Sequence, residues 1–290
     1  MQKLLVAAVF AALPLLSVPV AAATPPAPAP KAAAAQPADA AIDQALAGKH
    51  RSEANRARDV YRHPKQTLGF FGVSPEQNII EITPGGGWYT EVLAPLTHGK
   101  GHLTAAVVDP TSAKSDNAKK YYTRTNQEFA DKLAADKELY GEVKTVAFDI
   151  SAPKFGPDGA ADVVLTFRNV HNWLGSNSEQ AMFNGFFAAL KPGGTLGVVE
   201  HRAKPGTSRD DSKKSGYMDV DFVKTLAKNA GFELAAESEI NANPKDTKDY
   251  EGGVWTLPPT YGAGDKDREK YKAIGESDRM TLRFVKPKAK

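Results

Sequence analysis

The chain has 290 residues, a formal net charge of +3 and no cysteine. Without cysteine there is no disulfide scaffold, no thiol nucleophile and no cysteine-ligated metal. The small net charge, with acidic and basic side chains interspersed along the chain, argues against an extended basic face of the kind that binds nucleic acid.

The first residues read as a targeting segment. Lys3 precedes an almost wholly apolar run over residues 4–20, and three alanines follow at 21–23. This order is typical of a secretory signal peptide, cleaved near Ala23, and the shortness of the run argues against a permanent membrane anchor. Residues 24–40 are rich in proline and alanine and read as a linker. We therefore expect a periplasmic or secreted protein with no stable membrane insertion after cleavage.

Residues 41–290 have the composition of one globular α/β domain. A helix is predicted over 39–61, ended by His63-Pro64, and a second short segment over 65–72, so that 41–77 form an N-terminal helical cap. The predicted strands are 78–82, 103–108, 143–148, 161–167, 195–199, 232–238 and 279–285, and the later helices are 90–96, 118–140, 178–190 and 219–230. Apolar strands alternating with helices predict a mostly parallel sheet covered on both faces. Residues 241–278 are an insert before the last strand.

A glycine turn joins the first strand to its helix. Glu81 lies near the end of the strand, and Gly85, Gly86 and Gly87 follow before the helix begins. Such a turn lets the backbone approach a ligand and presents the N-terminus of a helix to it. A dinucleotide fingerprint would place its third glycine where Thr90 stands, which argues against a dinucleotide-dependent oxidoreductase.

The acid-x-Gly-x-Gly-x-Gly pattern is matched at Glu81, Gly85 and Gly87, with Thr83 in place of the first glycine. Together with the Lys-Pro-Gly-Gly-Thr-Leu segment at 191–196, this makes residues 78–284 resemble the class I S-adenosylmethionine (SAM)-dependent methyltransferases, and in particular a group of secreted bacterial ones. The resemblance implies a Rossmann-like fold whose seven-stranded sheet is mostly parallel, with the last strand antiparallel and helices on both faces.

The same resemblance implies a cofactor site for SAM at the carboxyl ends of the strands. Glu81 would order the glycine loop of Gly85, Gly86 and Gly87 near the methionine amino group. Asp109, after the second strand, would bind the ribose diol, since a carboxylate can accept both hydroxyl groups. The adenine amine would face Asp149 and the backbone of Ile150, after the third strand. Arg168, at the end of the fourth strand, is placed with these cofactor-binding residues.

The acceptor side is predicted after the fourth strand. His171 is the candidate general base, needed only if the acceptor must lose a proton, and Asn169 could fix the acceptor. No metal site is expected, because His63, His171 and His201 lack metal-ligand spacing. The expected function is methyl transfer to a small molecule outside the cytoplasm, with the oligomeric state left open. The alternative is an exported protein that binds a small ligand on this fold without turnover. The helical cap and the insert are predicted to cover the acceptor pocket.

Overall fold

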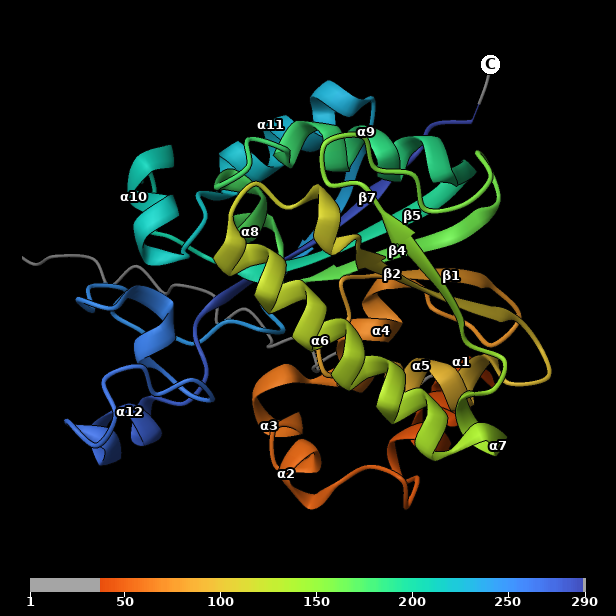
Figure 1. Ribbon diagram of the computed structural model, residues 1–290, viewed down its shortest axis with the longest axis horizontal. Coiled ribbons are helices and arrows are strands. Elements are labelled where there is room, and N and C mark those ends of the chain that lie inside the picture. The colour runs from red at the N-terminus through yellow and green to blue at the C-terminus, as the bar shows by residue number, and fades with distance from the viewer. Residues whose placement is uncertain (1–36, 289–290) are drawn as a thin grey trace, which may run out of the picture. The chain divides into compact units, whose positions relative to one another are not determined.

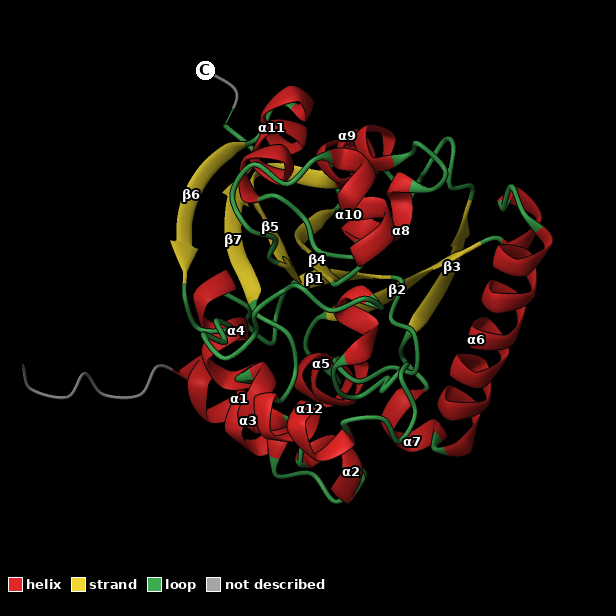
Figure 2. Cartoon of the chain, turned by 90° about the vertical axis from the view of Figure 1, so that its left-hand side faces the viewer, coloured by secondary structure: helices red, strands yellow, loops and turns green. Residues whose placement is uncertain are grey.

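The computed structural model describes residues 37–288, so the predicted signal peptide and most of the predicted linker lie outside the described residues. Seven strands form one sheet in the order β3-β2-β1-β4-β5-β7-β6 (Figures 1 and 2). Their bounds are β1 Asn78–Ile82, β2 His102–Val108, β3 Lys144–Phe148, β4 Ala161–Phe167, β5 Leu190–His201, β6 Glu233–Ser238 and β7 Arg279–Val285.

Strands β1 to β5 pair in parallel, while β7 runs antiparallel to both of its neighbours, β5 and β6. The predicted fold class is confirmed in this respect: a mostly parallel sheet of seven strands whose last strand is antiparallel. The parallel strands end at one edge, and in open α/β sheets that edge is the ligand crevice. The sheet thus brings the segments after β1, β4 and β5 together there.

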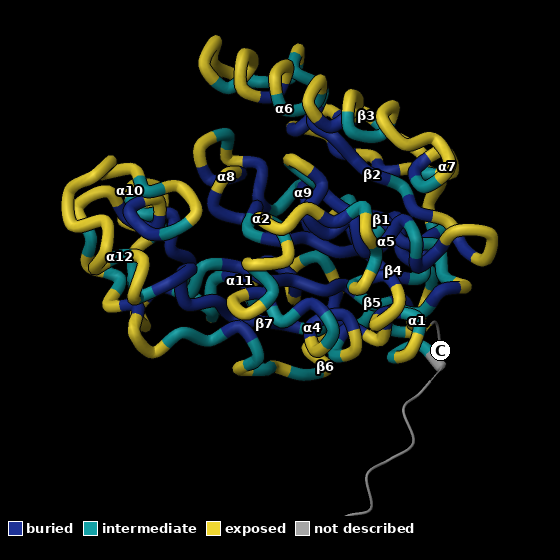
Figure 3. Tube along the Cα trace, turned by 90° about the horizontal axis from the view of Figure 1, so that it is seen from below, coloured by how far each residue is buried: buried dark blue, intermediate teal, exposed yellow. Residues whose placement is uncertain are grey.

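Helices cover both faces of the sheet. The helices of one face are α1 Pro37–Leu46, α4 Pro64–Phe71, α5 Thr90–Thr97 and α6 Asp116–Ala135, and those of the other are α8 Val170–Leu174, α9 Glu179–Ala189 and α11 Val220–Ala230. On the first face Ile42 and Leu68 pack against β-strand side chains such as Leu165. On the second, Phe183 and Phe186 belong to the larger apolar core. Figure 3 shows the central strands β1 and β4 among the most deeply buried parts of the trace, whereas β6, at one edge of the sheet, is exposed or half-buried.

Two helices that were predicted as continuous are broken in the structure. The helix expected over 39–61 is three pieces, α1, α2 Glu53–Arg56 and α3 Asp59–Arg62, because the chain turns at Gly48 and Ser52 then caps α2 through the Asn55 amide. The helix expected over 118–140 breaks at Asp136, whose side chain caps α7 Lys137–Tyr140. Such oxygen-bearing side chains begin a new helix because they accept its free amide hydrogens.

The insert and several short helices complete the structure. The predictions missed α8, α10 Arg209–Ser215, α12 Arg268–Ile274 and the 3-10 turns η1 Pro110–Ser112 and η2 Gly253–Thr256. Both α12 and η2 belong to the insert between β6 and β7. Figure 1 shows α12 on the same side of the molecule as α2 and α3 of the helical cap. Within residues 37–288, no helix is both long enough and apolar enough to span a bilayer.

Candidate functional site

The glycine loop after β1 is shaped to admit a ligand. Gly85 and Gly87 have φ angles of 58° and 72°, in the left-handed region that glycine tolerates best. A side chain built at Gly85 or Gly86 would meet no protein atom within 4 Å, so the loop faces open space. Thr83 also has a positive φ, of 49°, and therefore keeps the backbone course that a glycine would favour there.

Glu81 lies beneath this loop, 2% exposed, and its carboxylate accepts a hydrogen bond of 2.6 Å from Thr90 Oγ1 at the start of α5. Burial raises the pKa of Glu81 to about 7, against the opposing effects of Thr90 and Lys132. The residue thus ties β1 to the helix that follows the loop.

A cavity of about 370 Å³ opens beside the loop, a volume in the range of ligand pockets. It is lined by Glu81, Gly85, Gly86, Arg168, Asn169 and His171 among the residues predicted from the sequence. Gly87, Asp109, Asp149 and Ile150 are not in its lining. Apart from Gly87, the structure therefore brings together the predicted residues of β1, its loop and the segment after β4, and places those after β2 and β3 outside this cavity.

Asp109 and Asp149 nevertheless have the same local geometry. Asp109 Oδ1 accepts hydrogen bonds from the amide and hydroxyl groups of Thr111, both at 2.8 Å. Asp149 Oδ1 does the same with Ser151, at 2.7 and 2.6 Å. In both residues these bonds use Oδ1, so Oδ2 is the oxygen that each can offer to a ligand.

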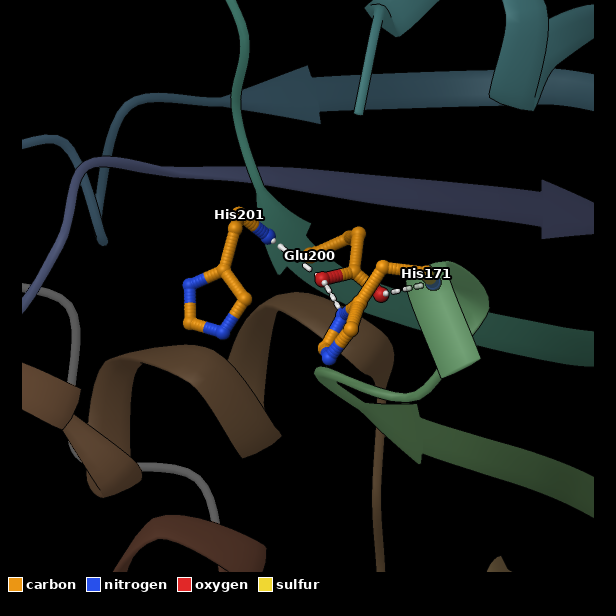
Figure 4. A group of neighbouring side chains, drawn as sticks. All are labelled: His171, Glu200 and His201. Atoms are coloured by element: carbon orange, nitrogen blue, oxygen red, sulfur yellow. Dashed lines mark hydrogen bonds and ion pairs between the residues drawn. The ribbon is translucent and has the colours of Figure 1, made fainter. Parts of the chain in front are cut away.

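His171 and His201 line the cavity, and the fully buried Glu200 contacts His171 (Figure 4). His171 is 8% exposed, and its Nδ1 lies 3.0 Å from Glu200 Oε1. An ionised carboxylate only accepts hydrogen bonds, so this contact assigns the proton to Nδ1 and leaves the lone pair on Nε2. Glu200 therefore holds His171 in the tautomer that can accept a proton at Nε2.

His201 lies beside this pair, with its ring centroid 5.2 Å from that of His171. Its Nδ1 is 2.5 Å from Ser277 Oγ, in the insert. Burial, followed by the charges of His171 and Arg168, lowers the pKa of His201 well below its ordinary value. His201 is thus expected to stand in the cavity wall as a neutral imidazole.

The same three residues offer nitrogen and oxygen atoms within 4.8 Å of one another, the one such group among the described residues. Glu200 is already committed, however. Its Oε1 accepts from His171 Nδ1 and from the His201 amide, and its Oε2 accepts from the Val170 amide at 2.6 Å and the His171 amide at 3.4 Å. These bonds fill the carboxylate's usual acceptor sites, so Glu200 orients His171 and is poorly suited to hold a metal ion.

The segment between β4 and His171 is held tightly. Asn169 donates from its side-chain nitrogen to Ile82 O at 2.9 Å and to Thr166 Oγ1 at 3.3 Å, which leaves its amide oxygen for a ligand. Arg168 has a φ of 60°, and its amide donates to Val199 O at 2.7 Å. A left-handed backbone at a residue other than glycine is uncommon and often marks a functional position.

Sequence reasoning assigned no individual role to several other residues of the lining. Arg58 and Arg62 come from the helical cap, and Trp255, Glu276 and Ser277 from the insert. Contacts between these two regions join residues more than 200 positions apart, as in the bond of Arg58 to Glu276. The insert was predicted to lie over the acceptor pocket, but no local pattern marked Glu276 as the partner of arginines in the cap.

The aromatic residues after the glycine loop pack inward. The Tyr89 ring stacks on Phe167 at a centroid distance of 3.5 Å, and Trp88 donates from its indole to Asn55 O at 3.0 Å. The guanidinium group of Arg62 lies 4.6 Å from the centre of the Trp88 ring. Both aromatic residues line the cavity while serving mainly to join the helical cap to the sheet.

Comparison of the sequence with protein-family models and with curated protein sequences gives no match. Solved structures do match. A SAM-dependent methyltransferase from Aquifex aeolicus aligns with a TM-score of 0.51 and 13% identity, over 86% of this chain and 98% of its own. The (4+2)-cyclase SpnF aligns with a TM-score of 0.53 and 18% identity, over 84% of this chain and 86% of its own. At these identities the likeness shows the fold: the chain has the Rossmann-like fold of class I methyltransferases.

Proposed function

We propose that this protein transfers a methyl group from SAM to a small-molecule acceptor. The observation that carries the proposal is the cavity between the glycine loop of β1 and the His171–Glu200 pair. The loop fits the cofactor because Gly85 and Gly86 leave the space of their missing side chains open to a ligand. The free carboxylate oxygens of Asp109 and Asp149 suit the ribose hydroxyls and the adenine amine.

When bound, SAM would supply an electrophilic methyl group on its sulfonium sulfur. The protein's part is to place an acceptor in line with that methyl group and to exclude water. His171 Nε2 then takes the acceptor's proton where the acceptor carries one, and Glu200 holds the ring and stabilises the resulting imidazolium. Asn169 offers its amide oxygen to orient the acceptor. The methyl group would pass to the acceptor, and S-adenosylhomocysteine would remain.

The test is calorimetric titration of the purified protein with SAM and S-adenosylhomocysteine. We expect micromolar binding, weakened about tenfold or more in Asp109→Ala, because a charge-assisted hydrogen bond is worth about 1.5–3 kcal/mol. Gly86→Val should also weaken binding, since its side chain would occupy the cavity without meeting protein. Gly69→Ala, on the exposed side of α4 and away from the cavity, is the matched control.

Absence of SAM binding to the folded wild-type protein would contradict this proposal. It would make the second reading the leading one, that of an exported protein holding another small ligand without turnover. The fold is compatible with this alternative, because SpnF, which has the same architecture, is described as a cyclase and not as a methyltransferase.

The insert and the helical cap are proposed to cover the bound acceptor. Both contribute residues to the lining of the cavity, among them Trp255 from the insert and Arg58 from the cap. Deletion of residues 243–262 should then speed the release of S-adenosylhomocysteine. An unchanged release rate and unchanged turnover would rule out a covering role.

We also propose that the protein acts outside the cytoplasm, on the basis of the apolar run and small residues at 4–23. SAM is charged, so it would need a transporter to reach that compartment. Fractionation of expressing cells tests the location, because mature protein found only in the cytoplasm would contradict it.

A further inference from the structure

Four arginines converge on one carboxylate at the side of the cavity. Glu276 Oε1 accepts from Arg58 Nε at 2.7 Å, and Oε2 accepts from Arg62 Nε at 3.1 Å. Arg279 Nη1 lies 3.1 Å from Oε2, and Arg168 Nη1 lies 4.0 Å from it. We call these five residues the arginine cluster. It joins the helical cap, the end of β4, the insert and β7.

The cluster carries more positive charge than its one carboxylate balances. Four guanidinium groups face Glu276, and Arg62, Arg279 and Glu276 are each no more than 3% exposed. Burial, followed by the charge of Arg168, lowers the pKa of Arg62 well below its ordinary value. Among the described residues, Arg58 Nη2 and Arg62 Nη1 are buried without a hydrogen-bond acceptor. An ion-pair network that served stability alone would need more acceptors than this one has.

The excess charge borders the ligand space. Arg58, Arg62, Arg168 and Glu276 all line the cavity, whereas Arg279 is held away from it by bonds to Ser277 O and Tyr61 O. Arg168 is the least committed member, since 4.0 Å is too long for a hydrogen bond to Glu276. Arg168 also has the left-handed backbone conformation described above, and the next residue is Asn169, which lines the same cavity.

The cluster lies at the acceptor side of the sheet edge. Glu276 precedes β7, and β4 and β5 stand between β7 and the glycine loop's strand β1 in the sheet. Ser277, the next residue after Glu276, contacts His201, whose ring neighbours that of His171. An anion held by Arg168 and Arg58 would therefore lie beside the proposed base.

We propose that the arginine cluster binds a carboxylate or phosphoryl group of the acceptor molecule, which makes the acceptor a small organic anion. This inference rests on the proposed methyl transfer. Guanidinium groups suit such a ligand because their paired N–H donors match two oxygens of a carboxylate or phosphate. The anion would supply the acceptors that Glu276 alone cannot, and would orient the rest of the acceptor towards His171 Nε2.

The test measures binding of inorganic phosphate and of malonate by calorimetry, with and without saturating S-adenosylhomocysteine. We expect both probes to bind the wild-type protein in the presence of S-adenosylhomocysteine. Arg168→Gln should weaken that binding roughly ten- to a hundredfold, because it removes a charge-assisted contact. Arg56→Gln removes the same charge from the exposed surface of α2, two residues from Arg58, and should leave the binding within about twofold.

Three outcomes would overturn the inference. One is a protein that binds S-adenosylhomocysteine but neither anion. Another is an equal effect of Arg168→Gln and Arg56→Gln. The third is competition between the anions and S-adenosylhomocysteine, together with weaker binding of S-adenosylhomocysteine by Arg168→Gln. That result would mean that the cluster binds the carboxylate of the cofactor itself. If the anions bind but neither S-adenosylhomocysteine nor SAM does, the proposed methyl transfer is contradicted while the anion site is supported. Arg58→Gln, also at a partly exposed side chain, repeats the test if Arg168→Gln does not fold.

Discussion

Glu276→Gln is the most informative single change for the stability of the fold. The side chain is 3% exposed and is the one carboxylate within the arginine cluster. The amide keeps the size of the side chain and removes its charge. Arg62 and Arg279 would then be buried beside Arg58 and Arg168 with no counter-charge. Removing one partner of a buried ion pair costs about 3–5 kcal/mol, since it strands the other.

The pKa of Glu276 gives the same magnitude by another route. Burial acts to raise this pKa, and the charges of Arg62, Arg279, Arg168 and Arg58 overcome it and lower the pKa from 4.5 to about 2. A tenfold change in an acid's dissociation constant corresponds to about 1.4 kcal/mol, so the ionised carboxylate contributes about 3 kcal/mol at neutral pH. Because the folded-state pKa is the lower one, this contribution is present above about pH 4.5 and is lost as the pH falls towards 2.

Urea denaturation from pH 7 to pH 3 measures both effects, in buffers free of phosphate and sulfate. We expect Glu276→Gln to lower the free energy of unfolding by about 3 kcal/mol at pH 7, with the difference shrinking below pH 4.5. Glu239→Gln, which breaks a solvent-exposed pair with Arg202, should cost no more than about 1 kcal/mol. A loss at Glu276 no larger than this control, or one independent of pH, would refute the reasoning.

Three further changes test other parts of the structure by the same urea assay. Burial raises the pKa of Glu81 from 4.5 to about 7, so wild-type stability should fall by about 3 kcal/mol as the pH rises across that interval, and Glu81→Gln should remove this slope. Thr83→Gly should raise the free energy of unfolding by up to about 1 kcal/mol, because it relieves a left-handed backbone and removes a buried hydroxyl without a described partner. A decrease in the free energy of unfolding of more than about 1 kcal/mol would contradict this. Gly197→Ala should cost about 1–3 kcal/mol, since its Cβ would lie 2.7 Å from Phe71, and an unchanged midpoint would show that α4 can shift.

The sheet was predictable because its signal is local. The strands predicted over 78–82, 161–167 and 279–285 have the bounds that the structure gives them. The first two are largely apolar segments and the third alternates between polar and apolar residues, and both patterns are local signals of a strand. The helix breaks were missed although their causes are local too. Ser52 and Asp136 are the caps at which α2 and α7 begin, and either could have been read as a start signal.

The two sides of the cavity differed in how far the sequence could predict them. The glycine loop, Arg168, Asn169 and His171 follow strands directly, so the parallel sheet alone brings them to one edge. Glu276 joins Arg58 only because a long insert folds back onto the helical cap. No periodic pattern encodes such a contact, and the charge of Glu276 read from the sequence is that of an ordinary surface residue.

This difference separates what the fold implies from what is particular to this protein. The segments after β1 and β4 are among those that the resemblance to methyltransferases describes, and under the proposed function they bind the cofactor and take part in the reaction. The cap and the insert bring Arg58, Arg62 and Glu276 to the rest of the cavity wall. Charge buried at a cavity wall favours ligands of opposite sign. Under the proposed function, the acceptor should therefore be recognised by residues of the cap and the insert together with Arg168.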